Sequence, residues 1–377
     1  MIPIIRNVVL LFVSIIHFNL IFGQKFAVVS DIHGSFPATL SVSNLVKSWH
    51  PEFIITCGDN NYASANAIDA QIGQFYHEFI YPYTGSYGLG DSVNSFYSAL
   101  GNHDVEDGGI SSYLSYVNLP GNERYYDFVK GFVHFFCINS NADEPDGVAD
   151  TSVQAQWLQN HLAASTSLYN LVYFHHSPYT SGMAHGSITY MQWPFKQWGA
   201  TAVFSGHDHI YERLNVGNFP YFVCGTGGGA LNAVSLVPGS QFIDNLHHGA
   251  LLLEATAENL LVKFINTNDS LIDSYFIAPV ISLNINKSES FDDPDVTIYP
   301  NPAGNHVSIR FKNNRQPYSI TITDIFGRIV FFKHYINNSC NFETTIHEID
   351  VEDLTKGIYF AKLSCQDKEY SGKIVIN

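Results

Sequence analysis

The most constraining feature of this chain is a repeated pattern in which short apolar runs end at clusters of Asp, Asn and His. The run Phe26-Ala-Val-Val stops just before Asp31, and Phe53-Ile-Ile-Thr stops just before Gly58-Asp59. Buried parallel strands have continuous apolar sequences, and their carboxyl ends meet at one edge of a sheet. The pattern therefore predicts an α/β enzyme with its site at that edge. The five clusters are Asp31-Ile-His33, Gly58-Asp59-Asn-Asn-Tyr62, Gly101-Asn102-His103-Asp104, His175-His176 and Gly206-His207-Asp208-His209.

Two segments between these runs have helical periodicity. Gln154 to Leu162 places Trp157, Leu158 and Leu162 on a common face, and Thr189 to Trp198 places Met191 and Phe195 on another. Such stripes are typical of helices that pack on a core. We predict a helix in each segment and assign these side chains to packing alone.

Length and charge limit the classes of protein to consider. With 377 residues, the chain is long enough for roughly two domains of about 150 residues each. Its formal charge of −16 argues against nucleic acid as a stable partner and against an anionic membrane surface, because both require a basic face. A small phosphorylated substrate is compatible with this charge if bound cations make the local field positive.

The ends of the chain differ in composition from its middle. Residues 1–24 resemble a secretory signal peptide, with Arg6 before an apolar stretch and a cleavage region near Gly23. A membrane anchor is the competing interpretation, although the stretch is short for a stable membrane span. We predict a catalytic domain over residues 25–281, a polar and acidic linker over 282–295, and a β-rich domain over 296–377.

Five cysteines are too few for a dense disulfide scaffold. Cys57, Cys137 and Cys224 lie in apolar runs, so we expect packed thiols. Cys340 and Cys365 lie close together near the C-terminus and are candidates for a disulfide.

The five clusters suit a centre of two metal ions. Hydrolysis of a phosphate ester by such a centre needs two cations about 3.5 to 4 Å apart and a metal-bound hydroxide in line with phosphorus. Carboxylates, amide oxygens and imidazoles are the ligands that serve this purpose. Each cluster alone is weak evidence for metal binding, but five in one order at predicted strand ends are not expected from turns alone.

Together the clusters resemble the calcineurin-like metallophosphoesterase superfamily, and more narrowly the small, mammalian-like purple acid phosphatases. The resemblance covers about Lys25 to Leu214. It implies a four-layer α/β/β/α sandwich and two metal ions, Fe with Fe, Zn or Mn. It also implies these ligands: Asp59 to both ions, Asp31 and His209 to the first, and Asn102, His176 and His207 to the second.

Three assignments stay open at this point. His33 and Tyr62 compete to bind the first metal, and the spacing Asp59-Asn-Asn-Tyr62 favours Tyr62, which would give a coloured ferric protein. His176-Ser-Pro resembles the family element, so we choose His176 as ligand and expect its neighbour His175 on the other face of the strand. Two residues are candidates to protonate the leaving alkoxide: His103, oriented by Asp104, and His185.

The resemblance and the predicted signal peptide together imply a secreted acid phosphatase that hydrolyses phosphate monoesters. A phosphodiesterase or nucleotidase with the same centre is the alternative, and a non-catalytic metal-binding protein of the cell surface is the rival from another class. The run Gly225-Thr-Gly-Gly-Gly-Ala230 formally matches a dinucleotide fingerprint. The residues after it do not predict the required helix, so we expect a tight loop near the metal cleft.

The C-terminal residues carry a second resemblance. Its motifs are Ile298-Tyr-Pro-Asn-Pro-Ala303, Asp324-Ile-Phe-Gly-Arg328, Leu354-Thr-Lys-Gly-Ile-Tyr359 and Lys373-Ile-Val-Ile376. They resemble the C-terminal sorting domain of the type IX secretion system. The resemblance implies a small all-β, immunoglobulin-like sandwich, recognition by the type IX secretion machinery, and export to the outer cell surface or the medium.

Overall fold

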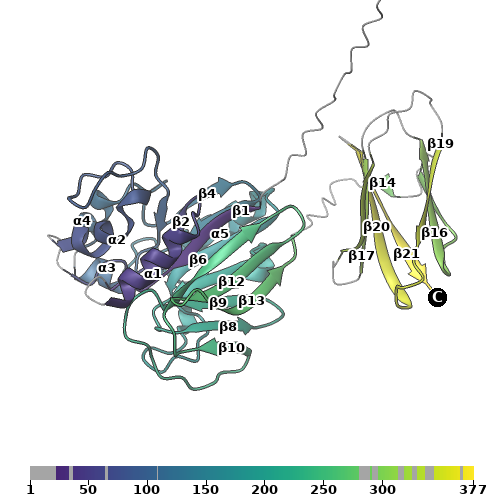
Figure 1. Ribbon diagram of the computed structural model, residues 1–377. Coiled ribbons are helices and arrows are strands. Elements are labelled where there is room, and N and C mark those ends of the chain that lie inside the picture. Colours follow the sequence, from purple (N-terminus) through teal and green to yellow (C-terminus); the bar gives the residue numbers. More distant parts are fainter. Residues whose placement is uncertain are drawn as a thin grey trace, which may run out of the picture. The chain divides into compact units, whose positions relative to one another are not determined.

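A computed structural model describes ten segments of the chain: residues 23–33, 37–63, 67–107, 109–279, 289–290, 296–312, 318–324, 329–335, 344–365 and 368–377. The chain divides into two compact units, Met1–Val280 and Ile281–Asn377 (Figure 1). Almost all of the predicted signal peptide and most of the predicted linker lie outside the described residues. Within the described residues no helix is long and apolar enough to cross a membrane.

The first unit contains a six-stranded sheet with the order β13-β12-β11-β1-β2-β3. Its central strand β1 is parallel to β2 and antiparallel to β11, so Val28 lies between Ile55 and Leu251. The strands are β1 (Gln24–Val29), β2 (Ile54–Thr56), β3 (Phe96–Ser98), β11 (Gly249–Ala255), β12 (Leu260–Asn266) and β13 (Leu271–Ile277).

A seven-stranded sheet with the order β10-β8-β9-β7-β6-β5-β4 packs against the first. Its inner strands β5, β6, β7 and β9 are parallel. The strands are β4 (Tyr126–Lys130), β5 (Val133–Cys137), β6 (Tyr169–His176), β7 (Ala202–Gly206), β8 (Tyr211–Asn215), β9 (Pro220–Cys224) and β10 (Ser240–Asp244).

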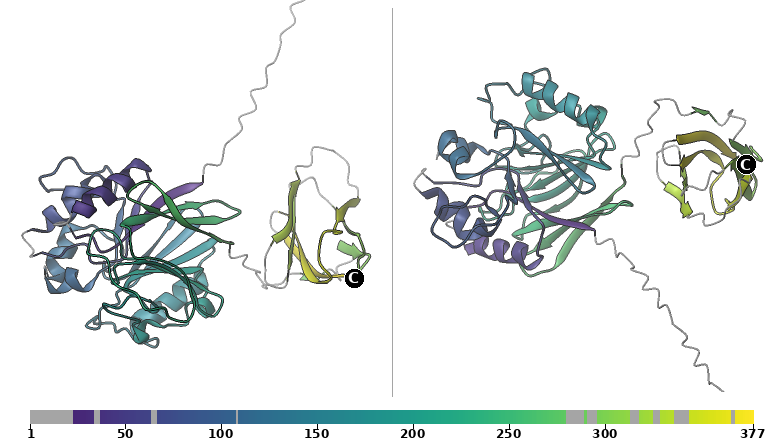
Figure 2. Two further views of the ribbon diagram at one scale, coloured as in Figure 1. Left: turned by 60° about the horizontal axis from the view of Figure 1, so that its bottom comes forward. Right: turned by 90° about the horizontal axis from the view of Figure 1, so that it is seen from above.

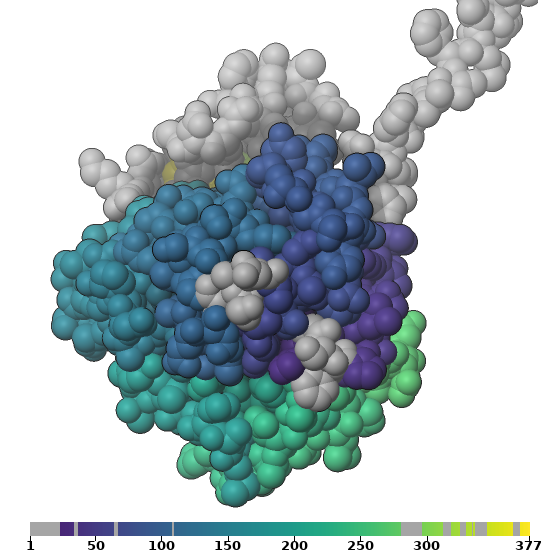
Figure 3. Space-filling model, turned by 90° about the vertical axis from the view of Figure 1, so that its left-hand side faces the viewer, coloured from purple at the N-terminus to yellow at the C-terminus, as the bar shows by residue number. Residues whose placement is uncertain are grey.

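Helices cover the outer faces of both sheets, which gives the four-layer α/β/β/α sandwich that the sequence predicts. Helix α1 (Pro37–Ser48) lies against β11, and α5 (Val153–Ala164) packs on the far sheet (Figure 2). A helical insertion between β2 and β4 forms much of the surface in Figure 3. It contains η2 (Asp69–Gly73), α2 (Gln74–Tyr76), η3 (His77–Phe79), α3 (Asn102–Glu106) and α4 (Ile110–Tyr116).

Strand β6 shows how the layers are filled. Leu171 and Tyr173 face the core between the two sheets, whereas Val172 and Phe174 face the core beneath the helices. All four side chains are fully buried. A strand covered on both faces needs apolar residues at every position, which explains the continuous apolar run.

The two predicted helices have different outcomes. The segment around Gln154–Leu162 is helical, and the Ser152 side chain caps α5 by accepting a hydrogen bond from the amide of Ala155. The prediction of one helix over residues 189–198 is wrong. The structure has a 3₁₀ turn η4 (Thr189–Met191) and a short helix α6 (Phe195–Trp198) instead. Pro194 separates them, because it lacks the amide hydrogen that a continuous helix requires.

The second unit is built around its own apolar core, and its strand pairs are antiparallel except for the short parallel pair β14–β21. In β17 the side chains of Tyr318, Ile320 and Ile322 are buried and alternate with partly exposed ones. Cys340 and the side chain of Cys365 lie outside the described residues, so their predicted pairing does too. The sheets are β14 (Glu289–Ser290), β21 (Lys368–Ile376), β20 (Gly357–Cys365), β17 (Tyr318–Asp324) and β18 (Ile329–Tyr335), and β15 (Val296–Tyr299), β16 (His306–Lys312) and β19 (Thr344–Asp350).

Candidate metal centre

The predicted site residues lie where strands of the two sheets end, and three of them have a strained backbone. The φ angles of Asp31, Asp59 and His207 are 58°, 50° and 72°. Non-glycine residues rarely adopt this left-handed region, and such strain is concentrated at functional sites. Each of the three residues follows a strand within three positions, so a sharp turn brings its side chain to the sheet edge. The turns that follow β1 and β2 are also hydrogen-bonded to each other, because the amide of Ile32 donates to the carbonyl of Asp59 at 2.8 Å.

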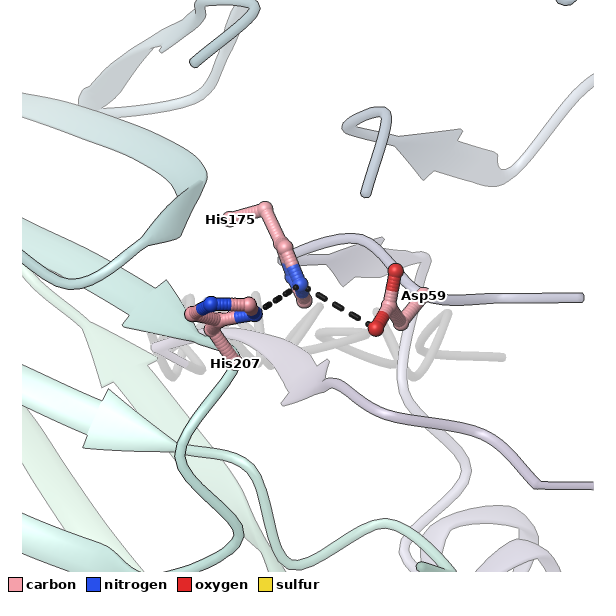
Figure 4. A group of neighbouring side chains, drawn as sticks. All are labelled: Asp59, His175 and His207. Atoms are coloured by element: carbon pink, nitrogen blue, oxygen red, sulfur yellow. Dashed lines mark hydrogen bonds and ion pairs between the residues drawn. The ribbon is translucent and has the colours of Figure 1, made fainter. Parts of the chain in front are cut away.

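The tightest group of possible ligands consists of Asp59, His175 and His207 (Figure 4). The Nε2 atom of His175 lies 3.1 Å from Asp59 Oδ2 and 3.0 Å from His207 Nδ1. On its other side, His175 Nδ1 donates to the carbonyl of Cys57 at 2.9 Å. This bond fixes the ring and points Nε2 at the group, as outer partners of metal-binding histidines do.

Electrostatics within this group follow from burial and charge. Burial opposes protonation of His175, but the neighbouring Asp59 carboxylate outweighs it and raises the pKa of His175 to about 9. Burial and the positive His175 lower the pKa of His207. The carboxylate and the two imidazoles lie so close together that they favour a positive charge between them.

A second group adjoins the first through Asp59. The hydroxyl of Tyr62 lies 3.1 Å from Asp59 Oδ2, 3.4 Å from Asp31 Oδ1 and 3.4 Å from His209 Nε2. His209 Nδ1 donates to the carbonyl of Ala230 at 2.9 Å, which directs Nε2 inward. Burial disfavours ionisation of Asp31, yet its bond to His209 holds the pKa of Asp31 below the usual value. Asp59 therefore lies between two groups of possible metal ligands.

Asn102 supplies a further test of whether these residues fit metal ions. Among the described residues its Oδ1 atom is buried and has no hydrogen-bond partner. Next to it, the amide of His103 donates to Asp59 Oδ1 at 3.0 Å, which keeps Asn102 beside that carboxylate. A buried acceptor without a donor is costly, and a cation would satisfy it. The set of carboxylates, imidazoles, phenol and amide oxygen fits Fe, Zn or Mn.

His33 and Tyr62, the two candidate ligands of the first metal, are placed differently relative to the ligand atoms. The Tyr62 hydroxyl lies among the ligand atoms, whereas the His33 ring is stacked on the Tyr62 ring with 4.4 Å between centroids. The ring of His103 covers the other side of Tyr62 at 4.3 Å. Burial and the Asp31 and Asp59 carboxylates raise the pKa of Tyr62 far above its usual value.

The expectation that His175 points away from the site is wrong. His175 is fully buried and continues the Leu171–Tyr173 side of β6, which faces the first sheet and Asp59. The Nδ1 atom of His176 instead lies 2.8 Å from Ser140 Oγ. The rings of His176 and His207 are 4.5 Å apart, so His176 borders the group from the side. Burial and His175 lower the pKa of His176 to about 3.

Asp104 does not orient the ring of His103. Its carboxylate accepts hydrogen bonds from the amides of Asn60, Asn61 and Gly101, at 2.9 to 3.2 Å. It thereby holds the turn that carries Asp59. The residue at His103 Nδ1 is Asp107, at 2.6 Å, one helical turn further along α3. Burial and the Asp59 charge raise the pKa of Asp104 to about 7.

His185 lies beside His207, a member of the first group of possible ligands. Its ring is exposed and stacked on the His207 ring, with centroids 3.8 Å apart. The amides of His185 and Gly186 each donate to the Asp208 carboxylate at 3.2 Å. Asp208 therefore anchors the loop that brings His185 to the centre, a role that the sequence does not indicate.

The glycine run closes a tight loop against the centre, as the sequence predicts. The amide of Gly227 donates to the carbonyl of Ser30 at 3.0 Å, and a side chain at Gly225 would collide with the Asp208 backbone. The residues that follow the run form no helix. The dinucleotide interpretation therefore has no structural basis.

Comparisons with known proteins agree with this geometry. Residues 24–211 match the family model described as calcineurin-like phosphoesterase, and residues 297–377 match the secretion system C-terminal sorting domain. Purple acid phosphatase 15 of Arabidopsis thaliana is 26% identical over 233 residues, which are 53% of this chain and 43% of the relative. Purple acid phosphatase 23 of the same plant is 26% identical over 241 residues, 54% of this chain and 51% of the relative. The chain spans about half the length of these curated relatives.

Among solved structures, GAP50, described as the anchor in the inner membrane complex of Plasmodium, has a similar fold. The TM-score is 0.54 at 16% identity, over 68% of this chain and 89% of that chain. The first unit therefore belongs to the calcineurin-like phosphoesterase family, and the second is a secretion system sorting domain. The group Asp59, His175 and His207 lies within the residues that match the phosphoesterase family, and the sorting domain indicates type IX secretion.

Proposed function

We propose that this protein is an exported phosphatase that hydrolyses phosphate monoesters at the Asp31–His209 centre. The observation that carries the proposal is the meeting of Asp59, His175 and His207 from three distant parts of the chain, next to the unsatisfied Oδ1 atom of Asn102. Burying these polar groups together costs free energy of folding, so their burial does not stabilise the fold. A catalytic centre explains it.

Seven residues would hold the two ions. Asp59 would bind both, the hydroxyl of Tyr62 would bind the first, and His33 would support Tyr62 by stacking. Two adjacent cations supply charge that stabilises the phosphoryl oxygens and lowers the pKa of water. The ligands proposed for each ion besides Asp59 are Asp31, Tyr62 and His209 for the first, and Asn102, His175 and His207 for the second.

The protein's own groups complete the reaction. His103 is held by Asp107 through Nδ1, which leaves Nε2 to deliver a proton to the departing alkoxide. His185, whose ring is stacked on that of His207, would orient the phosphoryl group by hydrogen bonding. The helical insertion and the loop of residues 177–192 thus contribute one imidazole each to the substrate side.

The direct test is hydrolysis of an aryl phosphate by the purified protein before and after chelation, with elemental analysis and a visible spectrum. We expect activity that is lost with the metal and returns on reconstitution. If Tyr62 binds a ferric ion, the protein is coloured and Tyr62→Phe bleaches it. A well-folded protein that binds no metal would reject the proposal. Stable metal binding without turnover on mono- or diesters would favour the non-catalytic rival.

After the predicted signal peptide has directed the chain to the periplasm, passage across the outer membrane is proposed to depend on the second unit. The match of residues 297–377 to the sorting domain supports this. Deleting the residues after Asp295 is expected to leave active enzyme in the periplasm. Unchanged export of the truncated chain would contradict the proposal.

A further inference from the structure

Two buried thiols from opposite sheets touch directly beneath the metal centre. Cys57 follows β2 of the first sheet, and Cys224 ends β9 of the second. Their Sγ atoms are 3.6 Å apart although 167 positions separate them in the sequence. The side chains are 0% and 2% exposed. Cys137 is a third buried thiol, and its sulfur lies 3.8 Å from the carbonyl oxygen of Ser98.

Both cysteines are next to residues of the centre. The carbonyl of Cys57 accepts the hydrogen bond that orients His175, and Asp59 follows two positions later. Cys224 is followed by the glycine run, whose Gly227 binds the carbonyl of Ser30 beside Asp31. The pair therefore lies where the two halves of the centre, one from each sheet, meet.

We propose that Cys57 and Cys224 form a disulfide in the exported protein and so link the two sheets beneath the centre. A disulfide bond is about 2.05 Å long, so the two sulfurs need to approach by roughly 1.5 Å from their present separation. The change gives up the weak bond from the Cys224 thiol to the carbonyl of Ser205, now 3.0 Å. The cross-link closes a very long loop and restricts the unfolded chain strongly.

The reaction is a thiol–disulfide exchange. A protein disulfide oxidant of the export route receives two electrons and two protons and becomes a dithiol, while the two S–H bonds of this chain are replaced by one S–S bond. Compartments outside the cytoplasm maintain such oxidants, and the sorting domain indicates passage through them. Both side chains are buried in the folded chain, so the exchange occurs during folding, before the core closes. The proposal depends on export and not on phosphatase activity.

Peptide mapping of the exported protein decides the question. Protein collected from the medium or cell surface is quenched in acid, denatured, alkylated without reductant and digested. We expect Cys137 to be alkylated, Cys57 and Cys224 to stay unlabelled, and a peptide pair linked through them to disappear on reduction. Alkylation of Cys57 and Cys224 to the same extent as Cys137 would overturn the proposal.

Thermal unfolding gives a second readout. Reductant is expected to lower the Tm of the first unit by roughly 10 °C. The double variant Cys57→Ala, Cys224→Ala is expected to show no response to reductant, whereas Cys137→Ala, which removes a thiol of similar burial, responds like the wild type. An equal response in the double variant and the wild type would contradict the cross-link. If the double variant does not fold, the peptide map of the wild type still decides.

Discussion

The two units of the chain bury different kinds of residue. The first unit buries a set of charged or titratable side chains almost completely: Asp31, Asp59, Asp104, His175, Asp208 and Glu212. Among the described residues of the second unit, Asp324 is the single buried charged side chain, and the core is otherwise apolar.

Removing charges from water costs several kcal/mol per ion unless partners compensate. In the first unit the partners are one another, backbone amides and, by our proposal, metal ions. The second unit needs no such arrangement, because a sorting signal is recognised at its surface. The comparison separates residues that are buried for chemistry from residues that are buried for folding.

The largest effect is expected for Asp59→Asn, which keeps the shape of the side chain and removes the carboxylate shared by both ligand groups. Loss of a residue that only supports a ligand lowers metal affinity or activity by about 10 to 100-fold. We expect more than about 10³-fold lower turnover, together with loss of bound metal by elemental analysis. His134→Ala is a matched control, because His134 pairs with Asp127 at 2.7 Å near the amino end of β6, away from the centre.

Variants at two neighbouring residues test which histidine binds the second metal. Because the Nε2 atom of His175 faces Asp59, His175→Ala is expected to remove one ion and lower turnover by more than about 100-fold. His176→Ala is expected to keep both ions, since His176 Nδ1 bonds to Ser140. The reverse result in metal analysis would restore the assignment of His176 as the ligand.

A smaller effect is expected at His103. Removing a general acid usually costs at least about 100-fold in rate, and we expect His103→Ala to lower kcat by about that factor with metal content unchanged. Asp107→Asn, which weakens the hold on Nδ1 at 2.6 Å, is expected to cost less. Loss of metal in His103→Ala would reassign this residue to the structure of the centre.

The sequence predicted most of the fold and the location of the centre for a physical reason. Strands covered on both faces require continuous apolar runs, and the polar cluster after each run marks its carboxyl end. The four layers are what the family resemblance implies, and the β-rich second unit follows from the alternation in its own sequence. The helix expected over residues 189–198 contains Pro194, which lacks an amide hydrogen and separates η4 from α6.

The same property of buried strands explains the error at His175. In Leu171-Val-Tyr-Phe174 every side chain is apolar, so the sequence carries no alternation that tells which face meets the first sheet. The choice between His175 and His176 then depended on motif similarity alone. Contacts such as those of Asp107 and Asp208 depend on how α3 and a distant loop are placed, and the sequence contains no local signal for them.

The smallest effect on catalysis is expected from the core of the second unit. Ile320 is fully buried in β17, and truncation of a buried isoleucine typically costs about 2 to 5 kcal/mol. Ile320→Ala should therefore lower the free energy of unfolding of this unit, followed by circular dichroism, and reduce the exported fraction. Turnover of the purified enzyme should stay within about twofold of wild type, because no residue of the proposed centre belongs to this unit. Leu158→Ala, an equivalent truncation on the buried face of α5, provides the contrast, since it should destabilise the first unit and leave the sorting domain folded. A large loss of turnover in Ile320→Ala at a temperature where the first unit is folded would show that the separation between chemistry and sorting is incomplete.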